Sequence, residues 1–171
     1  MIRDLIKSED PLLHKRIDSC SYNLDRQFLS KTLIESMMYH NGVGLSANQI
    51  GISERAFVMI RDIEYNEIIV CFNPKIINQS EEEILMDEGC LSWPGLWLKV
   101  RRPEGIEVTY EDAKGELHEK AMFGLEARIF QHEYDHMEGT DFTKRVSKLK
   151  LDLAKKRLRK VQKKLDRVVV A

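Results

Sequence analysis

The chain has 171 residues, of which 43% are hydrophobic and 32% charged, and this suffices for one domain with a packed core. Its three cysteines are too few for a disulfide framework, and the opening residues, MIRDLIKSED, carry charges where a secretory signal needs an apolar run. No apolar stretch approaches the roughly 18 residues that a membrane span requires. We therefore expect a cytoplasmic, disulfide-free protein of one domain whose partners include neither a membrane nor DNA.

The net charge of −1 hides an uneven distribution of charge. Residues 141–171 contain 12 Lys and Arg against 3 Asp, a charge of +9, so the preceding 140 residues contain 15 basic and 25 acidic side chains, a charge of −10. We expect residues 1–146 to form the main domain. Residues 147–171 should form a basic helix that either belongs to this domain or is a short appendage to it.

The first predicted helix covers residues 24–38, where apolar side chains recur at helical spacing. Asn23 or Asp25 is a suitable N-cap, and Asn41-Gly42 should end the helix. His40 falls in the last turn, where an imidazole interacts favourably with the helix dipole. We favour that role for His40 over metal binding.

The next segment, residues 42–51, reads GVGLSANQIG and contains three glycines. Glycine permits a positive φ and the close approach of another backbone. This segment is therefore either an ordinary loop or a wall along which an extended ligand lies. Taken alone, the pattern favours the ordinary loop.

The middle of the chain carries β signals separated by turn residues. Residues 106–110 alternate, residues 112–115 supply turn chemistry, and residues 117–123 return, which together predict a hairpin. Further strands are predicted upstream at residues 56–60, at residues 68–72 before Asn73-Pro74, and at residues 83–86.

Residues 130–139, FQHEYDHMEG, follow a stretch, residues 124–130, that reads as helix. At 100° per residue, His132 and His136 lie about 40° apart on one helix face, so both imidazoles can reach one metal ion. Glu133 lies beside them, well placed to take a proton from a water that the ion activates. The spacing indicates a metallohydrolase.

A hydrolytic zinc or iron site needs a third protein ligand and an open position. No histidine follows His136, and Glu138 is too close in the same turn, so the third ligand must lie upstream. Cys90 has the best setting, because Gly89 and Pro94 mark a constrained, non-helical segment that can present a thiolate. The other upstream candidates are His14, His40, His118, Cys20 and Cys71.

The end of the chain, residues 147–167, reads as one amphipathic helix with Lys and Arg around an apolar stripe. The stripe consists of Leu149, Leu153, Leu158, Val161 and Leu165. We expect this stripe to dock the helix on the rest of the protein.

Three stretches of the chain together resemble the signature of one family, the peptide deformylases. That signature is a GxGLAAxQ loop, an EGCLS segment and a QHExDHxxG helix, and this sequence has GVGLSANQ at 42–49, EGCLS at 88–92 and QHEYDHMEG at 131–139. The resemblance covers roughly residues 5–145. One departure, Ser46 in place of alanine, leaves the predicted activity intact and bears only on how the loop packs.

The resemblance implies an α+β fold in which antiparallel strands surround the helix carrying the two histidines, with an N-terminal helix and a long C-terminal helix. It also implies hydrolysis of the formyl group from the N-terminal formylmethionine of new polypeptides, which releases formate. Cys90, His132 and His136 would bind one divalent ion, Fe²⁺ or Zn²⁺, and Glu133 would move the proton. The sequence leaves the choice of metal open.

The resemblance further assigns groups that bind the substrate. The oxyanion donors match the side-chain amide of Gln49 and the backbone N–H of Leu91. The peptide would lie as an extended strand bonded to the main chain of Val43, Gly44 and Gly89. Its methionine side chain would enter a pocket whose matched positions, each equally suited to plain core packing, are Val43, Met86, Leu125 and Ile129.

The roles of four nearby residues stay open. Arg128 either rims this pocket or lies on the helix surface. Asp135 either orients a ligand histidine or pairs with one of the arginines at 101–102. Trp93 and Trp97 either flank the peptide or anchor the packing.

The basic C-terminal helix has a second interpretation in a family that acts on nascent chains. Lysine and arginine neutralise phosphates whatever the sequence, so the helix is a candidate for contact with ribosomal RNA near the exit of the nascent chain.

Two other kinds of protein compete with this assignment. A metalloprotease built on the same histidine pair is disfavoured, because its third ligand would lie downstream. A basic binding protein with a structural metal would need a fourth ligand, and no obvious one accompanies Cys90, His132 and His136.

Overall fold

The computed structural model describes residues 1–62, 64 and 67–169, with side chains described as far as residue 163. In the described part of the chain, no helix is long and apolar enough to cross a membrane. The elements in chain order, with η for a 3-10 helix, are η1 (Pro11–His14), α1 (Arg26–Tyr39), β1 (Gly44–Ser46), η2 (Ala47–Ile50), β2 (Ala56–Asp62), β3 (Glu67–Gln79), β4 (Glu83–Cys90), β5 (Trp93–Pro103), β6 (Gly105–Glu111), β7 (Leu117–Phe123), α2 (Gly124–Met137), η3 (Phe142–Arg145) and α3 (Lys148–Val169).

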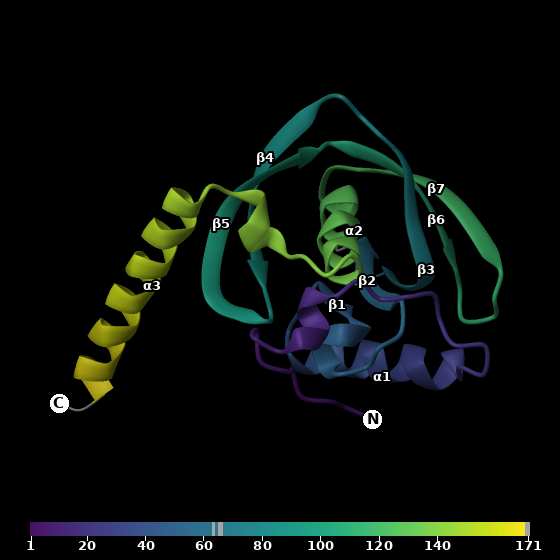
Figure 1. Ribbon diagram of the computed structural model, residues 1–171, viewed down its shortest axis with the longest axis horizontal. Coiled ribbons are helices and arrows are strands. Elements are labelled where there is room, and N and C mark those ends of the chain that lie inside the picture. The colour runs from purple at the N-terminus through teal and green to yellow at the C-terminus, as the bar shows by residue number, and fades with distance from the viewer. Residues whose placement is uncertain (63, 65–66, 170–171) are drawn as a thin grey trace.

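The strands form two antiparallel groups around α2. One is a five-stranded sheet in the order β1-β2-β3-β6-β7, and the other is the hairpin of β4 and β5. Figure 1 shows α2 in the middle of the molecule, between these two groups, with α1 below it and α3 at the outer side of the hairpin. This arrangement confirms the predicted α+β fold with antiparallel strands around a central helix.

The strand β2 is apolar on both faces because a helix covers each of them. Phe57 and Met59 pack with the α2 cluster, while Ala56 and Val58 pack with the α1 cluster. Successive side chains of a strand point to opposite faces, so this alternation follows directly from the strand geometry. Phe57 meets Phe130 of α2 edge to face, with the ring centroids 5.0 Å apart.

Several predicted boundaries move in the structure. The prediction that a strand stops before Asn73-Pro74 is wrong, because β3 runs on to Gln79. Asn73 has a φ of 49°, and the pairing with β6 shifts register between Phe72 and Lys75. A bulge of this kind accommodates a proline, which cannot donate to the ladder. The sequence analysis also did not predict β5 and stopped β4 at residue 86.

The C-terminal helix α3 docks on the protein through a different stripe from the predicted one. Leu151, Ala154 and Leu158 pack against the cluster of β5 and η3 side chains, and only Leu158 belongs to the predicted stripe. The other predicted members with described side chains, Leu149, Leu153 and Val161, are 69%, 46% and 55% exposed. Leu165 lies outside the described side chains. The predicted stripe and the observed stripe overlap on the helical wheel, and the position of β5 decides which of them packs against the protein.

Gly139 ends α2 and carries a clear stability prediction. Its φ is +71°, and an added Cβ would lie 2.5–2.9 Å from backbone atoms of Lys15 and Arg16. We expect Gly139→Ala to destabilise the protein by about 2 kcal/mol or more, because left-handed strain and overpacking add. Urea and thermal unfolding measure this, with the melting temperature falling roughly 2–4 °C per kcal/mol.

Gly124→Ala is the matched control for this substitution. Gly124 also has a positive φ, +56°, but an added Cβ would meet no atom within 4 Å. Equal destabilisation by both substitutions would show that the contact with Lys15 and Arg16 contributes nothing.

Candidate metal centre and active site

Cys90, His132 and His136 converge in the structure. One potential ligand atom from each lies within 4.8 Å of the other two, and Cys90 Sγ is 3.3 Å from His136 Nε2. Two features of the chain bring them together. The i, i+4 spacing on α2 places both imidazoles on one face, and a register shift between Gly89 and Cys90 interrupts the regular pairing of β4 with β5 next to the thiol.

The three groups suit a divalent metal ion. They form a soft thiolate and two imidazoles, a donor set that both zinc and ferrous iron accept. The histidines are buried, and the thiol faces the base of a cavity of about 460 Å³. The cavity leaves an open side for water or substrate, as a hydrolytic site requires.

Electrostatics in the cluster favour the thiolate. Burial alone would raise the pKa of Cys90, but His136 and His132 lower it to about 5. Burial would likewise lower the pKa of both histidines, whereas their interactions with Cys90 raise them. The two rings beside the thiol therefore favour its thiolate form, the form that binds a metal ion.

Glu88 orients His132 from behind. Its Oε2 lies 3.0 Å from His132 Nδ1, while Arg102 donates two hydrogen bonds to the carboxylate, at 2.7 and 2.9 Å, and Arg128 donates a third, at 2.7 Å. Burial would raise the pKa of Glu88, but the hydrogen bonds from His132 and Arg102 hold it far below the usual range. This carboxylate fixes the ring so that Nε2 is the nitrogen free to face the ion.

The structure shows where two residues whose roles were left open, Arg128 and Asp135, lie. Arg128 is buried and lines the cavity, where it also donates to the carbonyls of Val100 and Ile84, so it does not lie on the helix surface. Asp135 pairs with Arg102 and with Arg145, which extends the ionic network one layer further from the histidines.

Glu133 sits on the cavity side of the same helix turn. It is 4% exposed, and burial raises its pKa to about 7, with its Oε2 unpaired by any described residue. Gly44 of β1 faces it, and a Cβ at that position would lie 2.9 Å from the carboxyl carbon Cδ. The glycine therefore leaves the space in which this carboxylate lies.

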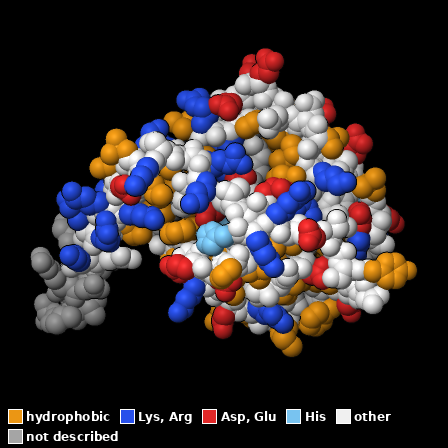
Figure 2. Space-filling model, in the orientation of Figure 1, with side chains coloured by type: hydrophobic (Ala, Val, Ile, Leu, Met, Phe, Trp, Pro, Cys, Tyr) orange, Lys and Arg blue, Asp and Glu red, His pale blue; other side chains and the backbone are white. Residues whose placement is uncertain are grey.

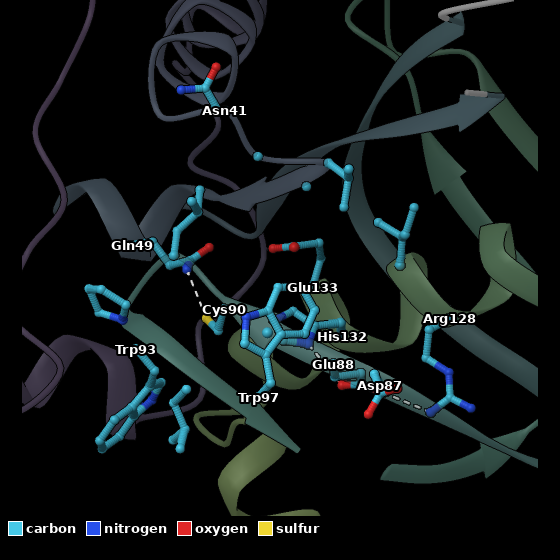
Figure 3. Close-up of a pocket in the computed structure, with 18 of the residues that line it drawn as sticks. Asn41, Gln49, Asp87, Glu88, Cys90, Trp93, Trp97, Arg128, His132 and Glu133 are labelled. Atoms are coloured by element: carbon cyan, nitrogen blue, oxygen red, sulfur yellow. Dashed lines mark hydrogen bonds and ion pairs between the residues drawn. The ribbon is translucent and has the colours of Figure 1, made fainter. Parts of the chain in front are cut away.

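Gln49 approaches the cluster from η2. Its Oε1 accepts hydrogen bonds from the backbone N–H and the hydroxyl of Ser46, both at 3.0 Å. Its Nε2 donates to Ser92 Oγ at 3.0 Å and to Cys90 Sγ at 3.4 Å, as the dashed line in Figure 3 marks. Ser46 thus orients the amide of Gln49, a role that the sequence analysis did not see in this departure from the family pattern.

The cavity brings together most of the predicted substrate-binding residues. Val43, Gly44, Gly89, Leu91, Leu125 and Ile129 all line it. Met86 is the exception and is not among the residues that line the cavity. The prediction of an ordinary loop at residues 42–51 is wrong. That segment forms β1 and η2 and makes one wall of the cavity.

The two tryptophans also line the cavity. Trp97 is 65% exposed and lies over Gly89, where a Cβ would come within 3.2 Å of its ring atoms. Figure 3 shows its ring near the middle of the view of the cavity, with Cys90 to one side. Trp93 lies deeper and donates to Asp141 at 3.2 Å, with Lys155 of α3 over its ring. Trp93 therefore serves both the cavity wall and the packing of α3.

The other candidate ligands lie elsewhere and have partners of their own. His14 contacts the carbonyl of Ser8, His40 contacts that of Arg3, and His118 lies 3.1 Å from Asp112 in the β6–β7 hairpin. The roles of Glu88, Ser92 and Asn48 were not predicted from the sequence. The available signal was their position inside two of the matched stretches, Glu88 and Ser92 in EGCLS and Asn48 in GVGLSANQ.

Comparison with known proteins agrees with this site. The family model for polypeptide deformylase matches residues 2–152. A peptide deformylase of Thermotoga petrophila is 37% identical over 161 residues, which span 92% of this chain and 95% of the relative.

Solved structures agree as well. A peptide deformylase of Legionella pneumophila superposes with a TM-score of 0.84 at 35% identity and covers 98% of this chain and 99% of its own. One from Acinetobacter baumannii, bound to Met-Ala-Ser, superposes with a TM-score of 0.78 at 31% identity, covering 85% and 99%. The chain belongs to the peptide deformylase family.

Proposed function

We propose that this deformylase hydrolyses the N-terminal formyl group of formylmethionyl polypeptides at the centre formed by Cys90, His132 and His136. One observation carries the assignment of residues. Three potential ligand atoms meet within 4.8 Å, and two of the residues that supply them, Cys90 and His132, line a cavity together with Glu133 and Gln49. A bound divalent ion, Fe²⁺ or Zn²⁺, would polarise the formyl group and make a water nucleophilic near neutral pH.

Glu133 is the proton carrier in this proposal. Water adds to the formyl carbon, the carbon–nitrogen bond breaks, and the products are formate and a free amine. Glu133 accepts the proton that the water loses and returns it to the departing nitrogen. A pKa of about 7 suits both halves of this task, because neither protonation state is then strongly disfavoured at neutral pH.

Gln49 and Leu91 are the donors to the developing oxyanion. The Gln49 amide is already aimed at the cluster by Ser46, so little reorganisation accompanies the reaction. Leu91 follows Cys90 directly and lines the cavity, which supports its backbone N–H as the second donor.

The peptide lies between two walls of the cavity in this proposal. Val43 just before β1, Gly44 on β1 and Gly89 on β4 supply main-chain groups to an extended chain. Leu125, Ile129 and the Val43 side chain then receive the methionine. The Acinetobacter baumannii relative binds Met-Ala-Ser, a peptide with an N-terminal methionine, which supports this orientation.

The basic helix α3 is proposed to contact ribosomal RNA. It packs on β5 through one face, so we place it in the same domain as residues 1–146. Figure 2 shows Lys and Arg side chains gathered over this side of the molecule. An enzyme of new polypeptides would work where they are made, and we therefore place it in the cytoplasm.

Replacing Glu133 tests the proton carrier. Glu133→Gln keeps the shape but cannot accept a proton, so we expect kcat to fall about 10²–10⁴-fold while the metal content stays unchanged. The rate of formate release from formyl-Met-Ala-Ser measures kcat, and elemental analysis measures the metal content. Glu126→Gln in the first turn of α2 is the control. A near-normal rate would exclude this role, and internal cleavage of a longer peptide would indicate a protease.

Replacing Gln49 tests the oxyanion donor. Gln49→Leu should lower kcat about a hundredfold with KM little changed, because the lost hydrogen bond strengthens only in the transition state. Steady-state kinetics with the same formyl peptide measure this. Gln79→Leu, at the exposed end of β3, serves as the control. A change confined to KM would mean that Gln49 binds the ground state only.

Charge reversal on α3 tests the contact with RNA. Lys156, Arg157 and Lys160 are exposed, and replacing all three by Glu should abolish co-sedimentation with ribosomes at low salt while hydrolysis of a short peptide continues. Reversal of Lys75, Lys114 and Lys120, which are exposed on the sheet, is the matched control. Retention of binding after the α3 reversals, or equal loss in the control, would refute the contact.

A further inference from the structure

The short helix η2 touches both elements that carry the proposed metal ligands. Gln49 reaches Cys90 at the end of β4, and the preceding residue, Asn48, reaches α2. The Asn48 amide donates to the main-chain carbonyl of His136 at 2.8 Å, and Asn48 is fully buried. Two successive side chains therefore connect the thiolate element and the imidazole element.

Asn48 binds the main-chain carbonyl of His136, which is only weakly hydrogen-bonded by the backbone of its own helix end. His136 lies in the last turn of α2, where carbonyls have no amide partner four residues on. The nearby backbone N–H of Gly139 reaches it at 3.3 Å, a longer bond than that from Asn48. Asn48 thus caps the helix end from another part of the chain, at the residue that carries a ligand.

The two histidines are held in different ways. The Glu88 carboxylate fixes the ring of His132 through Nδ1. Nδ1 of His136 has no hydrogen-bond partner among the described residues, while its Nε2 faces the Cys90 sulfur. With no acceptor to orient its ring, His136 depends on its backbone for its position. Asn48 is the side chain that holds this backbone.

We propose that Asn48 is a positioning residue that sets His136 and Gln49 relative to one another. This inference rests on the proposed assignment of the metal ligands. Because Asn48 lies beside Gln49 in η2, its bond to His136 fixes the distance from the oxyanion donor to the ligand cluster. The Oδ1 of Asn48 is buried without a hydrogen-bond partner among the described residues, which costs free energy. The contribution of this side chain therefore comes from its amide donor.

The test compares Asn48→Ala with Asn48→Leu, which fills the space without a donor. We expect metal affinity, measured with Zn²⁺ against a competing chelator, to fall about 10- to 100-fold in both. At saturating metal, kcat for a formyl peptide should fall while KM changes little. The visible absorption bands of the Co²⁺-substituted protein should shift, because they report the geometry of the ligands.

Thr32→Ala is the matched control. Thr32 is 1% exposed in α1, and its hydroxyl has no partner among the described residues, so its loss removes a buried polar group that belongs to neither η2 nor the ligand cluster. It should leave metal affinity and the Co²⁺ spectrum unchanged. If both Asn48 variants behave like Thr32→Ala and lose only thermal stability, the proposal is overturned.

A third variant separates this proposal from the assignment beneath it. Cys90→Ala should abolish tight metal binding. If it does and the Asn48 variants bind metal normally, only the role of Asn48 fails. If Cys90→Ala binds Zn²⁺ as tightly as the natural protein, the ligand assignment fails and the role of Asn48 fails with it.

Discussion

The buried carboxylate of Glu88 is the interaction on which the site depends. It bonds His132, one of the three proposed metal ligands, and two guanidinium groups, Arg102 from β5 and Arg128 from α2. A buried carboxylate with no partner would be strongly destabilising, and removing a single partner from such a group leaves a charge without compensation. The hairpin of β4 and β5 and the helix α2 are therefore held together by the same contacts that orient His132.

This network explains how the buried groups keep nearly constant positions relative to one another beside an open cavity. The mouth is formed by exposed apolar side chains such as Val43, Leu125 and Trp97, which a substrate would cover. The residues at the base of the cavity are charged and buried. Behind them, Asp135 pairs with Arg102 and Arg145. Rigidity thus lies behind the reacting groups, where it does not obstruct the path of a peptide.

The two sides of the cavity have different physical roles. The α2 side carries the histidines and Glu133 and is fixed by ion pairs. The side formed by β1 and η2 carries Gln49 and is fixed by neutral hydrogen bonds. Gln49 accepts from Ser46 and donates to Ser92, and Asn48 donates to the carbonyl of His136. Gly44 lets the two sides approach closely, because any side chain there would collide with Glu133.

Much of the site could be read from the sequence because its features are local. The helical spacing of His132 and His136, the β6–β7 hairpin and the setting of Cys90 all depend on residues close in the chain. Those patterns predicted the fold class and the members of the ligand cluster. Resemblance to a known family supplied the proposed roles of Gln49 and Leu91.

Only the tertiary structure decided the features that depend on distant partners. The sequence did not show β5, the continuation of β3 past Pro74, the stripe by which α3 docks, or the burial of Arg128. Each of these is set by what packs opposite, and residues far apart in the chain leave no periodic signal of their pairing. The same reason hid the bonds of Glu88 to His132 and of Asn48 to His136. A charged or amide side chain looks the same in a sequence whether it faces water or holds a buried imidazole in place.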